Sequence, residues 1–174
     1  MNRYGLIGIM LLLFMLEGTI VPWLVPVGFG DRIVPHFVFA FVLFAGLYGS
    51  RYMAFGLGIG FGLLQDIVYY GHLMGVHTFL MGLLGYTAGL LAANKRITLV
   101  MALAIIGLAT FAYDSGVYFI YSVFRISTET YDWAIIDHIA PSLFLQLIFA
   151  LVFYIPARRW FERIAPRQKS GEEE

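Results

Sequence analysis

Cysteine is absent from this 174-residue chain, and charged residues make up only 13% of it. The lack of cysteine excludes disulfides, thiol nucleophiles, iron–sulfur clusters and cysteine-ligated zinc. The shortage of charge argues against an ordinary soluble domain, in which about a quarter of the residues are charged. Basic residues gather only in a short C-terminal tail, so we expect no nucleic-acid partner.

Hydrophobic residues supply 60% of the sequence, and the mean hydropathy is +0.82. Six membrane spans of about 20 residues would use about 120 residues. We therefore predict an all-α, polytopic membrane protein, with six transmembrane helices in a compact bundle over residues 1–157 and a polar cytoplasmic tail over residues 158–174. The apolar runs place the spans at about 4–24, 36–49, 52–70, 77–93, 97–124 and 139–155.

Lysine and arginine divide unequally between the two sides of such a bundle. Two of them, Arg32 and Arg125, fall on one side. The other nine share the opposite side: Arg3, Arg51, Lys95, Arg96, Arg158, Arg159, Arg163, Arg167 and Lys169. Because basic loops stay in the cytoplasm, we predict a multi-pass protein of the inner (plasma) membrane. Both termini are expected to be cytoplasmic, with the 125–137 loop outside.

Glycines recur at helical spacing in the third and fourth predicted spans. Small residues let transmembrane helices approach each other closely. We therefore expect these two spans to be the central, tightly packed pair, away from bulk lipid. The helix-packing candidates are Gly56, Gly58, Gly60 and Gly62 in the third span, and Gly82, Gly85 and Gly89 in the fourth.

Three carboxylates interrupt the apolar runs. An ionised group in hydrocarbon normally faces a cavity, a partner or another polar group. At 1.5 Å per residue, Glu17, Asp66 and Asp114 all lie roughly 20–25 Å from the cytoplasmic ends of their spans, in the outer half of the bilayer. Gln65 and His77 share that depth, so these five residues are candidates for a pocket that takes a partner or a ligand.

Several roles are open to these polar groups. The acids and His77 could form a proton or cation relay, and His72, His77 and Asp66 could bind a metal. Hydrogen bonding between helices, or to the membrane segment of a partner, is the interpretation we favour. For Asp66 we expect hydrogen bonding from a neutral carboxyl, which asparagine would replace. No G-x-S-x-G, H-E-x-x-H or P-loop motif occurs, so we predict no catalytic residues, metal, cofactor or enzyme activity.

Between Pro35 and Ala93, the order of features resembles the MreD family of rod shape-determining membrane proteins. Residues 56–66 read GLGIGFGLLQD, and Gly71, Leu73 and Gly75 follow after a short loop. The run LLGY at residues 83–86 and then Gly89 complete the match. His36 follows Pro35 where the family pattern has aspartate or asparagine.

The resemblance implies a non-enzymatic membrane component of the bacterial cell-shape, or elongation, complex that scaffolds or regulates lateral peptidoglycan synthesis. The implied partners are MreC, RodA with its class B transpeptidase, the lipid bilayer and, indirectly, MreB filaments. The family also looks distantly like the six-span S-components of ECF-type transporters. The alternative function is therefore that of a vitamin-binding subunit, with an outward pocket near Glu17, Asp66 and Asp114.

Overall fold

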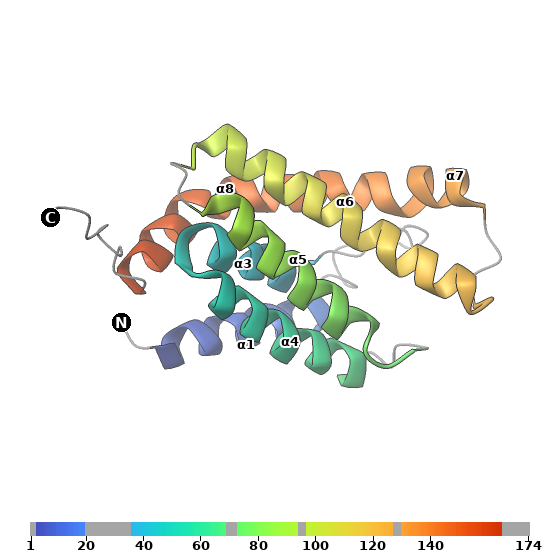
Figure 1. The fold of residues 1–174 in the computed structure, drawn as a ribbon, viewed down its shortest axis with the longest axis horizontal. Coiled ribbons are helices and arrows are strands. Elements are labelled where there is room, and N and C mark those ends of the chain that lie inside the picture. Colours follow the sequence, from blue (N-terminus) through green and yellow to red (C-terminus); the bar gives the residue numbers. More distant parts are fainter. Residues whose placement is uncertain (1–2, 20–35, 69–72, 94–96, 127–129, 165–174) are drawn as a thin grey trace, which may run out of the picture.

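The computed structural model is all-helical (Figure 1), and it describes residues 3–19, 36–68, 73–93, 97–126 and 130–164. Within these residues, six continuous helical segments run along one bundle. They are α1 (Arg3–Thr19), α3 (Phe37–Phe44) with the π-helical η1 (Ala45–Gly49), α4 (Arg51–Val68), α5 (Val76–Ala92), α6 (Leu99–Val123), and α7 (Tyr131–Ala134) with the π-helical η2 (Ile135–Ile139) and α8 (Ala140–Ile164). Helix α1 begins and α8 ends at the same end of the bundle, on the left of Figure 1, which we call the termini end.

The short helix α3 is the centre of the bundle. Every side chain from Val38 to Ala45 is at most 2% exposed, and α3 contacts α1, α4, α5 and α8. The expectation that the third and fourth spans are central and away from bulk lipid is therefore wrong, because α4 and α5 each expose a face. The tight packing expected between these two spans is confirmed. Hydropathy could not reveal this, since a helix that faces lipid is as apolar as one in the core.

Helices α4 and α5 pack backbone to backbone through part of the glycine pattern. A Cβ atom added to Gly58 would lie 2.6 Å from the Met81 carbonyl oxygen, and one added to Gly62 would lie 2.6 Å from Thr78 Cα. Added Cβ atoms at Gly56 and Gly60 would meet nothing within 4 Å. Only one of the two interleaved G-x-x-x-G pairs of α4 therefore packs within the described part of the chain.

The glycines of α5 contact other elements as well as α4. A Cβ atom on Gly85 would lie 2.8 Å from Val42 Cγ1 of the central helix, and one on Gly89 would lie 2.7 Å from Arg51 Cα. At Gly82 an added Cβ atom would lie 3.0 Å from Ile59 Cγ1. Small residues along α5 therefore let it lie close to both α4 and α3.

Large apolar side chains cover the outside of the bundle, as expected for a membrane protein and unlike a soluble monomer. The segments Leu99–Val123 and Tyr131–Phe161 are long and apolar enough to cross a membrane, and Gly5–Thr19, Phe37–Gly49 and Val76–Ala92 are shorter apolar helices. Apolar side chains exposed by 58% or more include Leu12, Met15, Tyr52, Phe79, Val100, Leu108, Phe119, Phe144 and Val152, on α1, α4, α5, α6 and α8.

The helices differ in length from the apolar runs that predicted them. The last helix runs from residue 131 to 164 instead of 139–155, so part of the predicted 125–137 loop and the start of the predicted tail are helical. Pro156 lies inside α8. An apolar run ends at the first charged residues, whereas a helix continues through charged residues because its hydrogen bonds join backbone groups. The end of the predicted first span, residues 20–24, lies outside the described residues.

Candidate functional site

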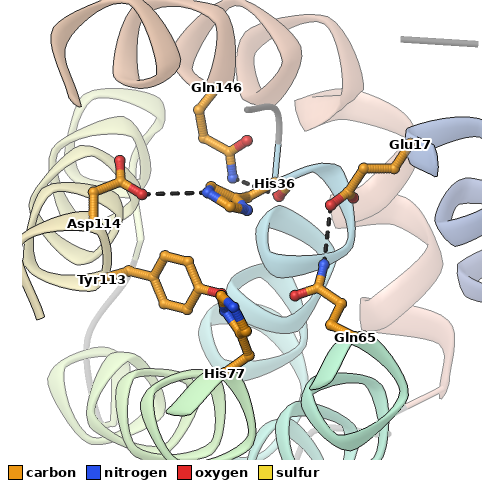
Figure 2. Close-up of polar contacts among 7 residues, drawn as sticks. All are labelled: Glu17, His36, Gln65, His77, Tyr113, Asp114 and Gln146. Atoms are coloured by element: carbon orange, nitrogen blue, oxygen red, sulfur yellow. Dashed lines mark hydrogen bonds and ion pairs between the residues drawn. The ribbon is translucent and has the colours of Figure 1, made fainter. Parts of the chain in front are cut away.

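Polar side chains from all six helical segments gather inside the bundle, away from the termini end. We call this group the polar cluster, and Figure 2 shows seven of its members. Most are almost completely buried, with exposed fractions of 9% for Glu17, 5% for Gln65, 2% for Asp66 and 1% for Gln146. The eight members are Glu17 on α1, His36 before α3, Gln65 and Asp66 on α4, His77 on α5, Tyr113 and Asp114 on α6, and Gln146 on α8.

Glu17 joins α1 to the two helices beside it. Its Oε1 accepts a hydrogen bond from Gln65 Nε2 at 3.0 Å, and its Oε2 accepts one from the Val38 backbone N–H at 3.2 Å. Val38 lies in the first turn of α3, where the backbone N–H groups have no partner within their own helix. One carboxylate therefore satisfies both a buried amide side chain and a helix N-terminus.

Asp66 holds the start of α5 from the neighbouring helix. Its Oδ2 accepts hydrogen bonds from the backbone N–H groups of Gly75 and Thr78, both at 3.0 Å, and from Thr78 Oγ1 at 2.6 Å. Its Oδ1 accepts one from the His77 N–H at 3.3 Å. Gly75 has φ +99°, a left-handed conformation that glycine adopts without strain. Asp66 is thus an N-terminal cap supplied by α4, and negative charge is favourable there.

The hydrogen bonds of Asp66 bear on the role predicted for its carboxyl group. A neutral carboxyl that donates a hydrogen bond needs an acceptor opposite it. Three of its partners are backbone N–H groups, which only donate, and the fourth is the Thr78 hydroxyl, which can donate or accept. The side chain therefore acts through hydrogen bonding, as an acceptor on both oxygens.

His36 connects the central helix to α6 and α8. Its Nε2 lies 3.3 Å from Asp114 Oδ1, and its backbone carbonyl accepts a hydrogen bond from Gln146 Nε2 at 2.8 Å. Since His36 immediately precedes α3, these contacts fix the point at which the chain enters the core. Figure 2 shows Asp114 facing the His36 ring from one side and the Gln146 side chain above it.

Tyr113 lies between the two histidines. Its hydroxyl is hydrogen-bonded to His77 Nδ1, and its ring meets the His36 ring edge-on at a centroid distance of 4.9 Å. On the other side, the ring stacks on Phe39 of the central helix at 4.7 Å. Tyr113 therefore links α6 to α3 by packing and to α5 by a hydrogen bond.

The polar cluster contains all five candidates from the sequence, Glu17, Gln65, Asp66, His77 and Asp114. Sequence reasoning missed three further members, His36, Tyr113 and Gln146. Gln146 could have been predicted as a member, because it is an amide side chain inside an apolar run and, like Gln65, needs a polar partner there. Nothing in the sequence distinguished Tyr113, since tyrosines are frequent in this chain.

The contacts in the polar cluster connect different helices. Ser115, which stands beside Asp114, has its Oγ 3.0 Å from the Tyr131 hydroxyl. Among the described residues, no group of three histidines, aspartates or glutamates is placed to hold a metal ion, and His72 lies outside them. An open groove of about 180 Å³ lies elsewhere, between α5 and α6, and Thr87 is the polar side chain in its lining.

The comparisons with known proteins agree with the resemblance noted in the sequence. The family model described as rod shape-determining protein MreD matches residues 1–164. The "Cell shape-determining protein MreD" of Streptococcus pneumoniae (strain ATCC BAA-255 / R6) is 25% identical over 133 residues, which cover 75% of this chain and 79% of that protein. No solved structure matches the chain.

Proposed function

Because this chain belongs to the MreD family of rod shape-determining proteins, we propose that it is a non-enzymatic membrane component of the bacterial cell-shape complex. In this proposal it scaffolds or regulates lateral peptidoglycan synthesis together with MreC and with RodA and its class B transpeptidase. Its link to MreB filaments is indirect. The observation that carries the proposal is the family match over residues 1–164 on a bundle with an apolar exterior.

We further propose that all six helical segments cross the inner membrane, with both termini in the cytoplasm. Three observations support this arrangement. The positive-inside rule assigns nine of the eleven lysines and arginines to the cytoplasmic side, and α1 begins where α8 ends. Arg51 opens α4 and Arg158 lies in the last two turns of α8, whereas Glu17 and Asp66 lie near the opposite ends of α1 and α4. The polar cluster then occupies the outer half of the bilayer.

A scaffold role fits what the polar cluster does chemically. Each buried carboxylate bonds to groups on other segments, so the cluster holds the relative positions of the helices. Leaving such a group unpaired in a buried site costs about 1–3 kcal/mol. A bundle fixed in this way presents a constant outer surface to other membrane proteins, which is what a scaffold requires.

Partner capture tests the proposal directly. The full chain, carrying a cytoplasmic affinity tag, would be expressed in a strain depleted of its own protein and purified from mild detergent. We expect restored rod shape and co-purification of MreC and the polymerase–transpeptidase pair. A tagged six-span membrane protein of another family is the control for non-specific capture.

The same experiment distinguishes the scaffold function from the alternative function. An S-component of a vitamin transporter would co-purify with ATPase subunits and a transport subunit. Recovery of those subunits, without MreC or RodA, would overturn the scaffold proposal. The side chains of Glu17, Asp66 and Asp114 favour the scaffold, because they bond to other parts of the bundle.

A further inference from the structure

The imidazole ring of His36 lies inside the bundle with one nitrogen in contact with an acid and the other unpaired. Its Nε2 is 3.3 Å from Asp114 Oδ1, and the two side chains are only 10% and 11% exposed. Its Nδ1 has no hydrogen-bond partner in the part of the chain that the structure describes. Which of the two nitrogens carry a hydrogen decides both the charge of the ring and what Nδ1 can bond.

The charge of Asp114 is compensated differently from that of the other buried carboxylates. Glu17 and Asp66 each accept hydrogen bonds from backbone N–H groups at the start of a helix. For Asp114, the interaction that the described residues provide is the one between Oδ1 and His36, and Oδ2 has no partner among them. A buried carboxylate needs a positive charge or several donors opposite it. A doubly protonated His36 would supply that positive charge.

Gln146 offers an unpaired acceptor on the same side of the cluster. Its Nε2 donates to the His36 backbone carbonyl at 2.8 Å, whereas its Oε1 has no partner within the described ranges. Figure 2 shows this amide group next to the His36 ring. A neutral ring with its hydrogen on Nε2 leaves Nδ1 and Gln146 Oε1 as two buried acceptors that lack a donor. A second proton turns Nδ1 into a donor and removes this excess of acceptors.

The central helix itself opposes a charged His36, so the groups around the ring matter. His36 is the residue just before the first turn of α3, where the helix dipole disfavours positive charge. Glu17 offsets this effect, because its Oε2 binds the Val38 N–H in that first turn. The nearest ionisable groups on the described elements around His36 are Glu17 on α1, Asp66 on α4, His77 on α5, and Tyr113 and Asp114 on α6, while α8 contributes the uncharged Gln146. Because three of them are carboxylates, they favour a positive charge on the ring.

We propose that His36 is a proton-binding site, at which a second proton on the imidazole ring pairs it with the Asp114 carboxylate and fixes the start of α3 to α6. With the proton bound, the contact is a charge-assisted hydrogen bond, which is about twice as strong as a neutral one. Without the proton, Asp114 is a buried negative charge with a neutral partner. The contact therefore stabilises the bundle most while His36 is charged, and this stabilisation is lost as the pH rises and His36 releases its proton.

Nitrogen-15 NMR of the full chain in lipid, with labelled histidine, reads the charge of the ring directly. At about pH 7 we expect both ring nitrogens of His36 to carry a hydrogen, whereas an ordinary exposed histidine is mostly neutral there. The signals of His36 are assigned by their loss in His36→Gln, or by elimination with variants of the other histidines if His36→Gln does not fold. A bare nitrogen on the wild-type His36 ring at this pH would overturn the proposal.

Asp114→Asn removes the carboxylate and should leave His36 neutral at the same pH, with one bare ring nitrogen. Asp132→Asn, at an exposed position, is the matched loss of a carboxylate and should leave His36 charged. The melting temperature of the wild type should fall as the pH is raised from about 6 to about 9, and Asp114→Asn should flatten that fall. A His36 ring that stays charged in Asp114→Asn would contradict the pairing. Because no partner protein is present, these results are separate from those of the partner capture.

Discussion

Gln65 on α4 donates a hydrogen bond to Glu17 on α1, at 3.0 Å between Nε2 and Oε1, across 48 positions of sequence. The other oxygen of Glu17 holds the first turn of the central helix. Three helices are therefore joined at one carboxylate. Because Glu17 is 9% exposed and Gln65 is 5% exposed, water provides little substitute for these bonds.

Replacing Glu17 by leucine should lower the stability of the bundle by about 1–3 kcal/mol, since it leaves Gln65 Nε2 and the Val38 N–H unpaired. Thermal unfolding in detergent would measure this. Met15→Leu on the same helix is the control, because Met15 is 72% exposed. In the Glu17→Leu/Gln65→Leu double variant, the loss should be smaller than the sum of the two single losses. Strictly additive losses would show that the pair does not interact.

Asp66→Asn should have an intermediate effect, and Asp66→Leu a severe one. The amide oxygen can take the place of Oδ2 and keep its three hydrogen bonds, but the NH₂ group then faces the His77 N–H, which is also a donor. Asp66→Leu leaves every donor at the start of α5 unpaired. Complementation of a depletion strain at matched membrane levels, with Asp132→Asn as the exposed control, would rank the variants. Equal damage from Asn and Leu would instead indicate an essential charge.

Gly58 and Gly56 offer a matched pair on one helix. Gly58→Ala should destabilise the bundle by about 1–3 kcal/mol, because the added methyl group meets the α5 backbone, which must move. Gly56→Ala should leave folding unchanged, since its methyl group meets nothing within 4 Å. The yield of monodisperse protein after heating would report both. Equal yields would contradict the close approach of α4 and α5.

A charge exchange tests the contact between His36 and Asp114. His36→Asp alone should reduce folded protein, because two carboxylates would face each other where Nε2 and Oδ1 are now 3.3 Å apart. Adding Asp114→His should restore much of the loss. Adding Asp132→His, at an exposed position, should not. Rescue by both second substitutions would mean that net charge matters and this contact does not.

The predicted topology can be tested with reporter fusions. A reporter that is active only outside the inner membrane should be inactive at Gln168 and active at Thr130, because the positive-inside rule places the termini in the cytoplasm. A cytoplasm-specific reporter should give the opposite pattern and serves as the control for expression. External activity at Gln168 would contradict the six-span arrangement.

The helical class, the apolar exterior and the residues that needed a polar partner could all be predicted from the amino-acid sequence. Hydropathy is a local property, so it located the helices to within a few residues at most ends. It predicted too short a last helix, because helical hydrogen bonding continues past the apolar run through Pro156 and into the arginines. The buried carboxylates could be recognised because an ionised group in lipid must find a partner.

The partners of those residues and the identity of the central helix became visible in the three-dimensional arrangement of the helices. Helix α3 has no glycine seam, and its apolar residues read the same whether they face lipid or protein. Gly56 and Gly58 belong to the same sequence pattern, yet only Gly58 contacts α5. Which face of α4 carries the contact depends on where α5 packs, and the pattern of glycines does not show this. His36 joined the polar cluster for the same reason: its contacts come from α6 and α8, more than 70 residues later in the chain.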